Sequence, residues 1–187
     1  MTTETEVTSD TDATTGAVTG ATTGAITDAI TGATERRNEA TMRRIYAELF
    51  DEGLLDRVDE LMAPDVRNHT APPGHRDGTG PVRELVAMLR TAFPDCRTVV
   101  EEVLARGDTV VMRNLFEGTH LGVFLGHPPT GRRFRFRQVH WMRFGPDGRV
   151  VEHWGVRDDV THLRQLGLMP EEHRGGAAHI SAIVDSC

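Results

Sequence analysis

Hydrophobic residues follow two spacings along the chain, first every three or four positions and later every second position. From residue 42 they recur at i, i+3, i+4 and i+7, which predicts an amphipathic helix that ends at Gly53. A shorter helix is predicted over residues 54–62, stopping before Pro64, and a third from residue 81 to about residue 93. The part of the chain that follows residue 35 is therefore expected to begin with three helices.

Four later segments have the composition of β-strands. They span residues 97–104, 109–117, 132–144 and 149–157, with Gly-Asp or Gly-Pro-Asp-Gly turns between them. A short helix over residues 160–166 follows, and Asp158 and Asp159 are placed to cap its start. Helices followed by a strand meander predict an α+β domain.

The segment 132–144 divides into two faces when its residues are read with a period of two. The face expected to lie against the core or a pocket carries Phe134, Phe136, Gln138, His140, Met142 and Phe144. The opposite face carries Arg133, Arg135, Arg137, Val139, Trp141 and Arg143. The arginines therefore indicate a solvated sheet face.

A hairpin register follows if the Gly-Pro-Asp-Gly turn is a four-residue loop. Counting back from it, His140 lies opposite His153. Gln138 then lies opposite Gly155. Directly opposed side chains in a sheet are about 5 Å apart, so the two imidazoles and the amide could engage one ligand inside an apolar cup.

The N-terminal segment is rich in Thr, Gly and Ala and repeats with a period of four from residue 15. A transient helix with Val18, Ile26 and Ile30 on one face is one interpretation. Gly and Thr are poor helix formers and the apolar stripe is thin, so residues 1–36 are instead predicted to be a disordered extension. Residues 37–170 are assigned to the domain and residues 171–187 to a C-terminal tail.

Composition excludes several classes of function. The chain of 187 residues is 38% hydrophobic, which suits one domain with a sizeable core. A formal net charge of -7 argues against a nucleic-acid partner, and no segment is long and apolar enough to span a membrane. Two cysteines, Cys96 and Cys187, provide no disulfide framework, so a reducing cytoplasm is the expected location.

Three motifs together resemble one family. Residues 118–133 read GTHLGVFLGHPPTGRR, residues 65–74 read DVRNHTAPPG, and residues 152–158 read EHWGVRD. In their order along the chain they are similar to segments of the SnoaL-like polyketide cyclases. That resemblance implies the NTF2-like fold, a cone-shaped barrel in which a curved antiparallel sheet and three N-terminal helices surround an apolar pocket, and it implies a homodimer.

The resemblance also implies a catalytic set. In the family, a Gln and a His on one strand stand beside an acid on the next, and the acid is the general acid/base of an intramolecular aldol closure. Gln138 and His140 match the first two. Gly155 stands where the family usually has Asp, so the acid is missing on this alignment.

His153 could take over the role of the acid, because an imidazole can gain or lose a proton near neutral pH. The predicted catalytic residues are therefore His140, His153 and Gln138. The residues predicted to contact the substrate are Tyr46, His69, His120, Phe124, Phe136 and Met142. His69 could instead be part of a turn, and His120 could instead cap its loop.

No cofactor is expected. The nine histidines lack the spacing of a metal site, and no nucleotide fingerprint is present. Three functions fit a small hydrophobic substrate: a cofactor-independent cyclase acting on a polyketide-like intermediate, an epoxide-opening enzyme of the same fold, and a non-catalytic carrier of a hydrophobic metabolite.

Overall fold

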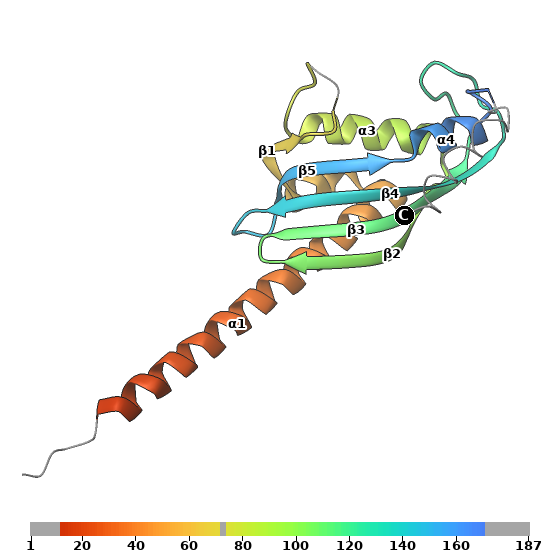
Figure 1. The fold of residues 1–187 in the computed structure, drawn as a ribbon. Helices are drawn as coiled ribbons and strands as arrows, with labels where there is room; N and C mark the ends of the chain where they lie inside the picture. Colours follow the sequence, from red (N-terminus) through yellow and green to blue (C-terminus); the bar gives the residue numbers. More distant parts are fainter. Residues whose placement is uncertain (1–11, 72–73, 171–187) are drawn as a thin grey trace, which may run out of the picture.

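A computed structural model describes residues 12–71 and 74–170 of the chain. Its helices are α1 (Asp12–Arg44), continued by a π-helix (Ile45–Asp51), a 3-10 turn (Leu55–Arg57), α2 (Val58–Leu61), α3 (Thr79–Ala92) and α4 (Asp159–Gln165). Its strands are β1 (Met62–Asn68), β2 (Arg97–Arg106), β3 (Thr109–Thr119), β4 (Arg133–Phe144) and β5 (Val150–Arg157). Figure 1 shows their arrangement.

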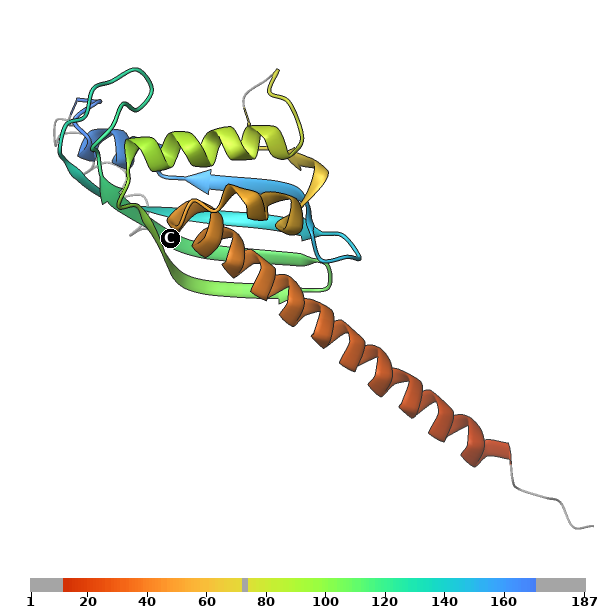
Figure 2. The same ribbon diagram turned by 180° about the vertical axis from the view of Figure 1, so that it is seen from behind.

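The five strands form one curved sheet in the order β1-β5-β4-β3-β2. Strands β2 to β5 pair antiparallel with their neighbours, and β1 pairs parallel with β5. Seen from behind, α3, α2 and the C-terminal part of α1 lie on one side of this sheet (Figure 2). The predicted α+β fold, a curved sheet covered by helices, is confirmed.

Strand β1 was not predicted, because its residues were assigned to the end of a helix and a loop. It contains Pro64, which has no N–H to donate and is therefore tolerated mainly in edge strands. β1 is an edge strand in the observed sheet. Its parallel pairing places Asn68 beside His153, and both residues line the cavity of the candidate site.

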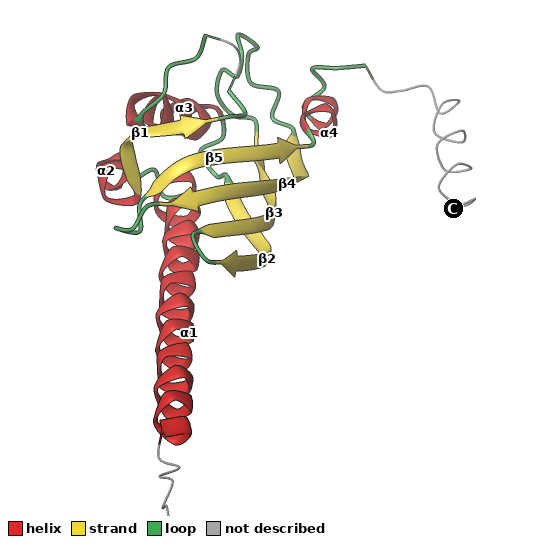
Figure 3. Ribbon diagram, turned by 60° about the vertical axis from the view of Figure 1, so that its left-hand side comes forward, coloured by secondary structure: helices red, strands yellow, loops and turns green. Residues whose placement is uncertain are grey.

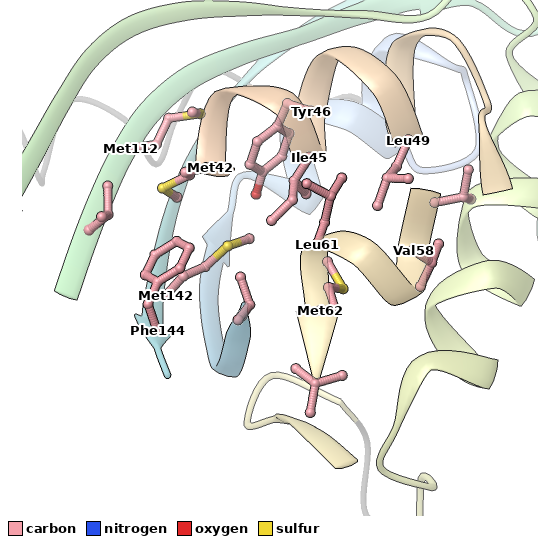
Figure 4. Close-up of a cluster of buried hydrophobic side chains, with 14 residues drawn as sticks. Met42, Ile45, Tyr46, Leu49, Val58, Leu61, Met62, Met112, Met142 and Phe144 are labelled. Atoms are coloured by element: carbon pink, nitrogen blue, oxygen red, sulfur yellow. The ribbon is translucent and has the colours of Figure 1, made fainter. Parts of the chain in front are cut away.

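The main hydrophobic core lies between the sheet and the helices (Figure 4). The helical stripe predicted from the sequence is buried there, with Met42, Ile45, Tyr46 and Leu49 at most 5% exposed. Strand β4 alternates strictly between exposed and buried positions, as predicted from its period of two. The core therefore fixes which face of β4 looks inward.

A second core cluster packs where α3, β4 and α4 meet. It consists of Ala92, Phe93, Cys96, Phe116, Phe124, Phe134, Phe136 and Leu166. Helix α4 begins after Asp158, whose carboxylate accepts a hydrogen bond from the Thr161 N–H at 3.0 Å. The predicted N-cap is thereby observed, and it fixes how the chain leaves the sheet.

The N-terminal repeat forms part of the first helix, while the assignment of residues 1–36 to a disordered extension stays a prediction. In the structure α1 starts at Asp12, so the repeat is helical and projects away from the domain (Figure 3). Each four-residue unit contains an alanine, the best helix former, and the helix continues from turns that the core already holds, so no new nucleus is needed. Ile26 and Ile30 are 55% and 62% exposed on it. Residues 1–11 and the predicted tail 171–187 lie outside the described residues.

Among residues 12–71 and 74–170, no helix combines the length and the apolar character needed to cross a bilayer.

Candidate active site

A cavity of about 260 Å³ lies between the sheet and helix α3. Apolar side chains from α3 and the π-helix line part of it, among them Phe50, Val82, Leu85 and Leu89. Its polar lining includes Tyr46, Asn68, Gln138, His140, His153 and Arg157. The cavity therefore combines an apolar wall with one polar side, as small-molecule sites usually do.

The predicted register between β4 and β5 is wrong by two residues. His140 lies opposite Gly155, and Gln138 lies opposite Arg157. The hairpin loop between β4 and β5 has one residue more than expected, because Phe144 pairs with Val150 and not with Arg149. The register shifts by one further residue at the next pair, where Arg143 lies opposite Glu152. Such a bulge adds a residue to one strand and is not visible in a simple count.

The two imidazoles still meet, as diagonal neighbours. His140 Nδ1 lies 3.1 Å from His153 Nε2, and the ring centroids are 5.4 Å apart. His140 Nε2 lies 3.1 Å from Gln138 Oε1, and His153 Nδ1 lies 3.0 Å from Asn68 Oδ1. Asn68, His153, His140 and Gln138 thus form one continuous hydrogen-bond chain along the polar side of the cavity.

Asn68 determines which ring nitrogens donate and which accept along this hydrogen-bond chain. Its Oδ1 accepts a hydrogen bond from the Thr70 N–H at 3.1 Å, so the oxygen is the atom that faces His153. His153 Nδ1 must then donate, and in the neutral ring His153 Nε2 accepts. It follows that His140 donates from Nδ1 and that His140 Nε2 is the ring nitrogen without a hydrogen.

Gln138 completes the chain through a second amide. Asn114 Nδ2 donates to Gln138 Oε1 at 3.2 Å, while Asn114 Oδ1 is buried without a partner among the described residues. Turning both amides end for end lets the Gln138 NH2 group donate to His140 Nε2 and to Asn114 Oδ1, and it leaves the Asn114 NH2 group as the buried group without a partner among the described residues. In this arrangement His140 Nε2 is the basic end of the chain and Gln138 can donate a hydrogen bond.

Burial keeps both imidazoles neutral. It is the main cause that lowers the pKa of His140 and of His153 below the ordinary value for histidine. The charge of Arg157 lowers both pKa values further. At neutral pH the pair can therefore accept a proton without first losing one.

Tyr46 provides a second hydrogen-bond donor on the opposite wall. Its ring lies 5.0 Å from the ring of His140 and packs in the core with Met62 and Met142 nearby (Figure 4). Burial raises the pKa of this phenol well above its ordinary value, so the hydroxyl keeps its proton.

The sequence profile of the SnoaL-like polyketide cyclases matches residues 40–166. This chain belongs to the SnoaL-like polyketide cyclase family. It is 38% identical over 121 residues to the nogalonic acid methyl ester cyclase of Streptomyces nogalater, a match that covers 63% of this chain and 89% of the relative. It is 33% identical over 145 residues to the aklanonic acid methyl ester cyclase AcmA of Streptomyces galilaeus, covering 72% and 95%.

Solved structures agree with this membership. The crystal structure of IdmH from Streptomyces antibioticus has a TM-score of 0.60 and 34% sequence identity, and the match covers 70% of this chain and 98% of that one. As a member of the SnoaL-like family the chain is an enzyme of the cyclase type with a small-molecule substrate.

Five of the nine predicted site residues line the cavity of this SnoaL-like domain. They are Tyr46, Gln138, His140, Met142 and His153. Met142 lies opposite His153 in the sheet, which gives it a position that the predicted register had assigned to His140.

The other four predicted residues lie elsewhere. His69 stacks on Trp154 with ring centroids 4.4 Å apart and reaches Glu152 at 3.3 Å, because β1 carries it to the outer face of the sheet. His120 is fully buried, its Nδ1 3.1 Å from the Thr130 hydroxyl. Phe124 and Phe136 pack in the second core cluster. None of these four residues lines the cavity.

Three residues of the polar side were not predicted. Asn68 was overlooked because strand β1 was not predicted. Asn114 shares a strand face with Val110 and Met112, and an amide on an otherwise apolar face was a usable signal. Arg157 has the same parity as His153 along β5, and this alternation alone could have found it.

Gly155, the position at which the family resemblance predicts an Asp, lies beside both imidazoles. A Cβ atom added there would lie 3.2 Å from His140 Nδ1 and 3.3 Å from His153 Cε1. The absence of a side chain therefore leaves room for the two imidazoles to contact each other.

Among residues 12–71 and 74–170, no group of three His, Cys, Asp or Glu side chains is arranged to hold a metal ion.

Proposed function

We propose that the protein is a cofactor-independent cyclase that closes a ring in a polyketide-like intermediate, with His140 and His153 as the acid/base pair and Gln138 orienting a substrate carbonyl. The observation that carries this proposal is the hydrogen-bond chain from Asn68 through His153 and His140 to Gln138, which borders an apolar cavity.

The reaction begins with a proton transfer. In the complex with substrate, the Gln138 NH2 group exchanges its hydrogen bond to His140 Nε2 for one to the substrate carbonyl oxygen, which frees the lone pair of Nε2. His140 Nε2 then accepts a proton from the carbon atom next to that carbonyl group, and the resulting positive charge is shared with His153 through their hydrogen bond. The enolate oxygen that forms accepts hydrogen bonds from the Gln138 amide or from the Tyr46 hydroxyl. Both donors are uncharged and held in place before the reaction.

Ring closure then restores the starting protonation state. The enolate carbon attacks a second carbonyl carbon of the same molecule, forming a carbon–carbon bond and an alkoxide. His140 returns its proton to the alkoxide oxygen. Substrate and product therefore have the same mass, and no oxidant or reductant is consumed.

The relatives support a choice of substrate class. Their names specify methyl esters of nogalonic acid and aklanonic acid as the molecules that are cyclised. We infer that this chain acts on a fused-ring polyketide of similar size. The apolar wall formed by α3 and the π-helix suits a flat hydrocarbon framework.

The test is incubation of purified, metal-stripped protein with nogalonic acid methyl ester and aklanonic acid methyl ester, followed by mass spectrometry. Conversion at unchanged mass supports the cyclase, and the product structure separates aldol closure from internal epoxide opening. A gain of one water would favour an epoxide hydrolase. Tight binding without conversion would favour a carrier.

We also propose that the protein is a homodimer joined through the outer face of β4 and β5. Val139, Trp141 and Val156 are 38%, 53% and 75% exposed on that face. Two of the arginines on that face already have carboxylate partners in the same chain, Arg135 with Glu117 at 3.2 Å and Arg143 with Glu152 at 3.1 Å. Sedimentation of the wild type and of Trp141→Glu tests this, with a dimer expected only for the wild type.

A further inference from the structure

Arg157 is a charged residue of the cavity that the proposed acid/base chemistry does not use. It is the last residue of β5, and along the strand it shares the inner face with His153 and Gly155. Its Cα pairs with that of Gln138 on β4. The guanidinium therefore belongs to the same polar side as the imidazole pair.

The cavity lining has positive charge without a negative counterpart. Its charged members are Arg76 and Arg157, and none of its described lining residues is Asp or Glu. Arg76 pairs with Glu84 on the surface, where both side chains are more than two thirds exposed. Arg157 is the arginine directly beside the catalytic strand positions.

The ion pair of Arg157 is weak. Its Nη2 lies 3.2 Å from Asp159 Oδ2, and the two side chains are 40% and 52% exposed. Ion pairs at such exposed positions contribute little and are screened by salt. A guanidinium carries five N–H donors, so a single contact with Asp159 does not exhaust its capacity to bind an anion.

No side chain separates Arg157 from the imidazole pair on their strand. Gly155 stands between Arg157 and His153 on the inner face, and the two imidazoles lie where its side chain would be. The Gly155 N–H donates to the Thr70 hydroxyl at 2.6 Å, so this backbone donor is already satisfied. The charge of Arg157 also acts on the cavity interior, since after burial it is a cause of the lowered pKa of His153.

We propose that Arg157 is a specificity residue that binds an anionic oxygen of the substrate, a carboxylate or an ionised enol, and thereby positions the reacting carbons at His140. The planar guanidinium fork matches two oxygens and forms strong charge-assisted hydrogen bonds. The substrate supplies the negative charge that the cavity lining lacks. This inference rests on the proposed site but concerns binding, so it can be tested without turnover.

The experiment measures binding of flat fused-ring probes by fluorescence quenching. Anthraquinone-2-carboxylate and its methyl ester differ in one charge. We expect the wild type to prefer the acid by about tenfold, which equals about 1.4 kcal/mol. Arg157→Gln should abolish this preference while leaving the ester affinity unchanged. Arg137→Gln removes a similar charge from the outer face of β4 and should change neither affinity.

A second arm separates the two kinds of anion. Binding of 2-hydroxyanthraquinone is measured below and above the pKa of the free probe. Tighter binding only of the ionised form, lost in Arg157→Gln, indicates recognition of an enolate-like oxygen. A preference confined to the carboxylate probe indicates recognition of an acid group.

Asp159→Asn is an independent variant in case Arg157→Gln does not fold. It removes the carboxylate that competes for the guanidinium, so the affinity for the acid should rise relative to that for the ester. Equal affinity for acid and ester in the wild type, including no binding of either, would overturn the proposal. A preference that survives in Arg157→Gln but disappears in Arg76→Gln would also overturn it. Failure of the cyclase reaction alone would leave the binding result standing.

Discussion

The domain buries two pairs of histidines, and their surroundings are of different kinds. His140 and His153 contact each other within a chain of amides at the edge of a cavity. His120 and His162 are packed against the aromatic rings of the second core cluster, where His162 stacks on Phe136 with centroids 4.4 Å apart. Both pairs belong to the same small domain.

The electrostatic effect of burial is the same for both pairs. Burial is the main cause that lowers the pKa of all four histidines. A lowered pKa therefore does not distinguish the proposed catalytic pair from the other pair in this protein. What distinguishes them is the partner of each ring nitrogen.

The ring nitrogens of the first pair all have polar partners, so a proton that arrives at His140 can be accommodated along the chain. In the second pair, Nε2 of His120 and Nε2 of His162 are buried without a hydrogen-bond partner among the described residues. Aromatic rings surround these nitrogens and cannot stabilise a second proton as an amide oxygen can. The proposed acid/base pair is therefore distinguished from the other buried pair by its directed hydrogen-bond chain and not by burial.

The largest expected effect is on turnover. His140→Gln or His153→Gln should lower kcat by about 100-fold or more, because general acid/base catalysis typically contributes that much. His162→Leu and His120→Leu, at the second pair, should leave kcat close to the wild-type value. Steady-state rates with the substrate that the wild type converts, together with circular dichroism to verify folding, check this. Equal losses in both pairs would break the comparison.

A smaller effect is expected from Asn68, which acts through His153. Asn68→Ala removes the acceptor for His153 Nδ1 and should lower kcat by about tenfold, close to the value of one hydrogen bond. Asn68→Asp keeps an acceptor, and its negative charge raises the pKa of His153. The rate should then recover while the acidic limb of the pH profile moves to higher pH.

The matched control is at the second pair, where the Thr130 hydroxyl contacts His120 Nδ1. Thr130→Val removes that contact and should leave both kcat and the pH profile unchanged. If Asn68→Ala alters only KM, or if Asn68→Asp leaves the pH profile where it was, Asn68 does not orient His153.

Much of this fold could be predicted, because its elements have clear periods. The stripe of Met42, Ile45 and Leu49 specified the helix that faces the core, and the strict alternation of β4 specified the inner positions of Gln138 and His140. These are local properties of consecutive residues. They remain valid whichever neighbour the element finally packs against.

The parts of the site that could not be predicted depend on pairing between elements. The register of β4 and β5 depends on a bulge after the hairpin, which no residue type specifies uniquely. Asn68 enters the site only because β1 pairs in parallel with a strand more than eighty residues later in the chain. The loop residues His120 and Phe124 carried the family motif, but the motif stabilises the second core cluster and does not line the cavity.

The smallest expected difference between the two pairs concerns stability in acid, where they should behave alike. Burial lowers the pKa of His162 from 6.5 to about 4 although Asp159 opposes the shift, and the charges of Arg157 and His120 lower it further. The unfolded chain therefore binds a proton at this residue first as the pH falls. The stability is complete above pH 6.5 and declines between pH 6.5 and about 4.

His162→Phe removes this titration and can keep the stacking on Phe136. Urea unfolding measures the free energy of unfolding at pH 7 and at pH 5. The wild type should lose up to about 2 kcal/mol more than the His162→Phe variant between these two pH values. His140→Gln should reduce the same pH dependence in the same direction, because burial lowers the pKa of His140 as well. Equal sensitivity to acid with unequal effects on kcat would show that burial is common to both pairs and that the chain of amides alone makes one of them catalytic. A His162→Phe variant with unchanged acid sensitivity would instead mean that His162 is not neutral in the folded protein.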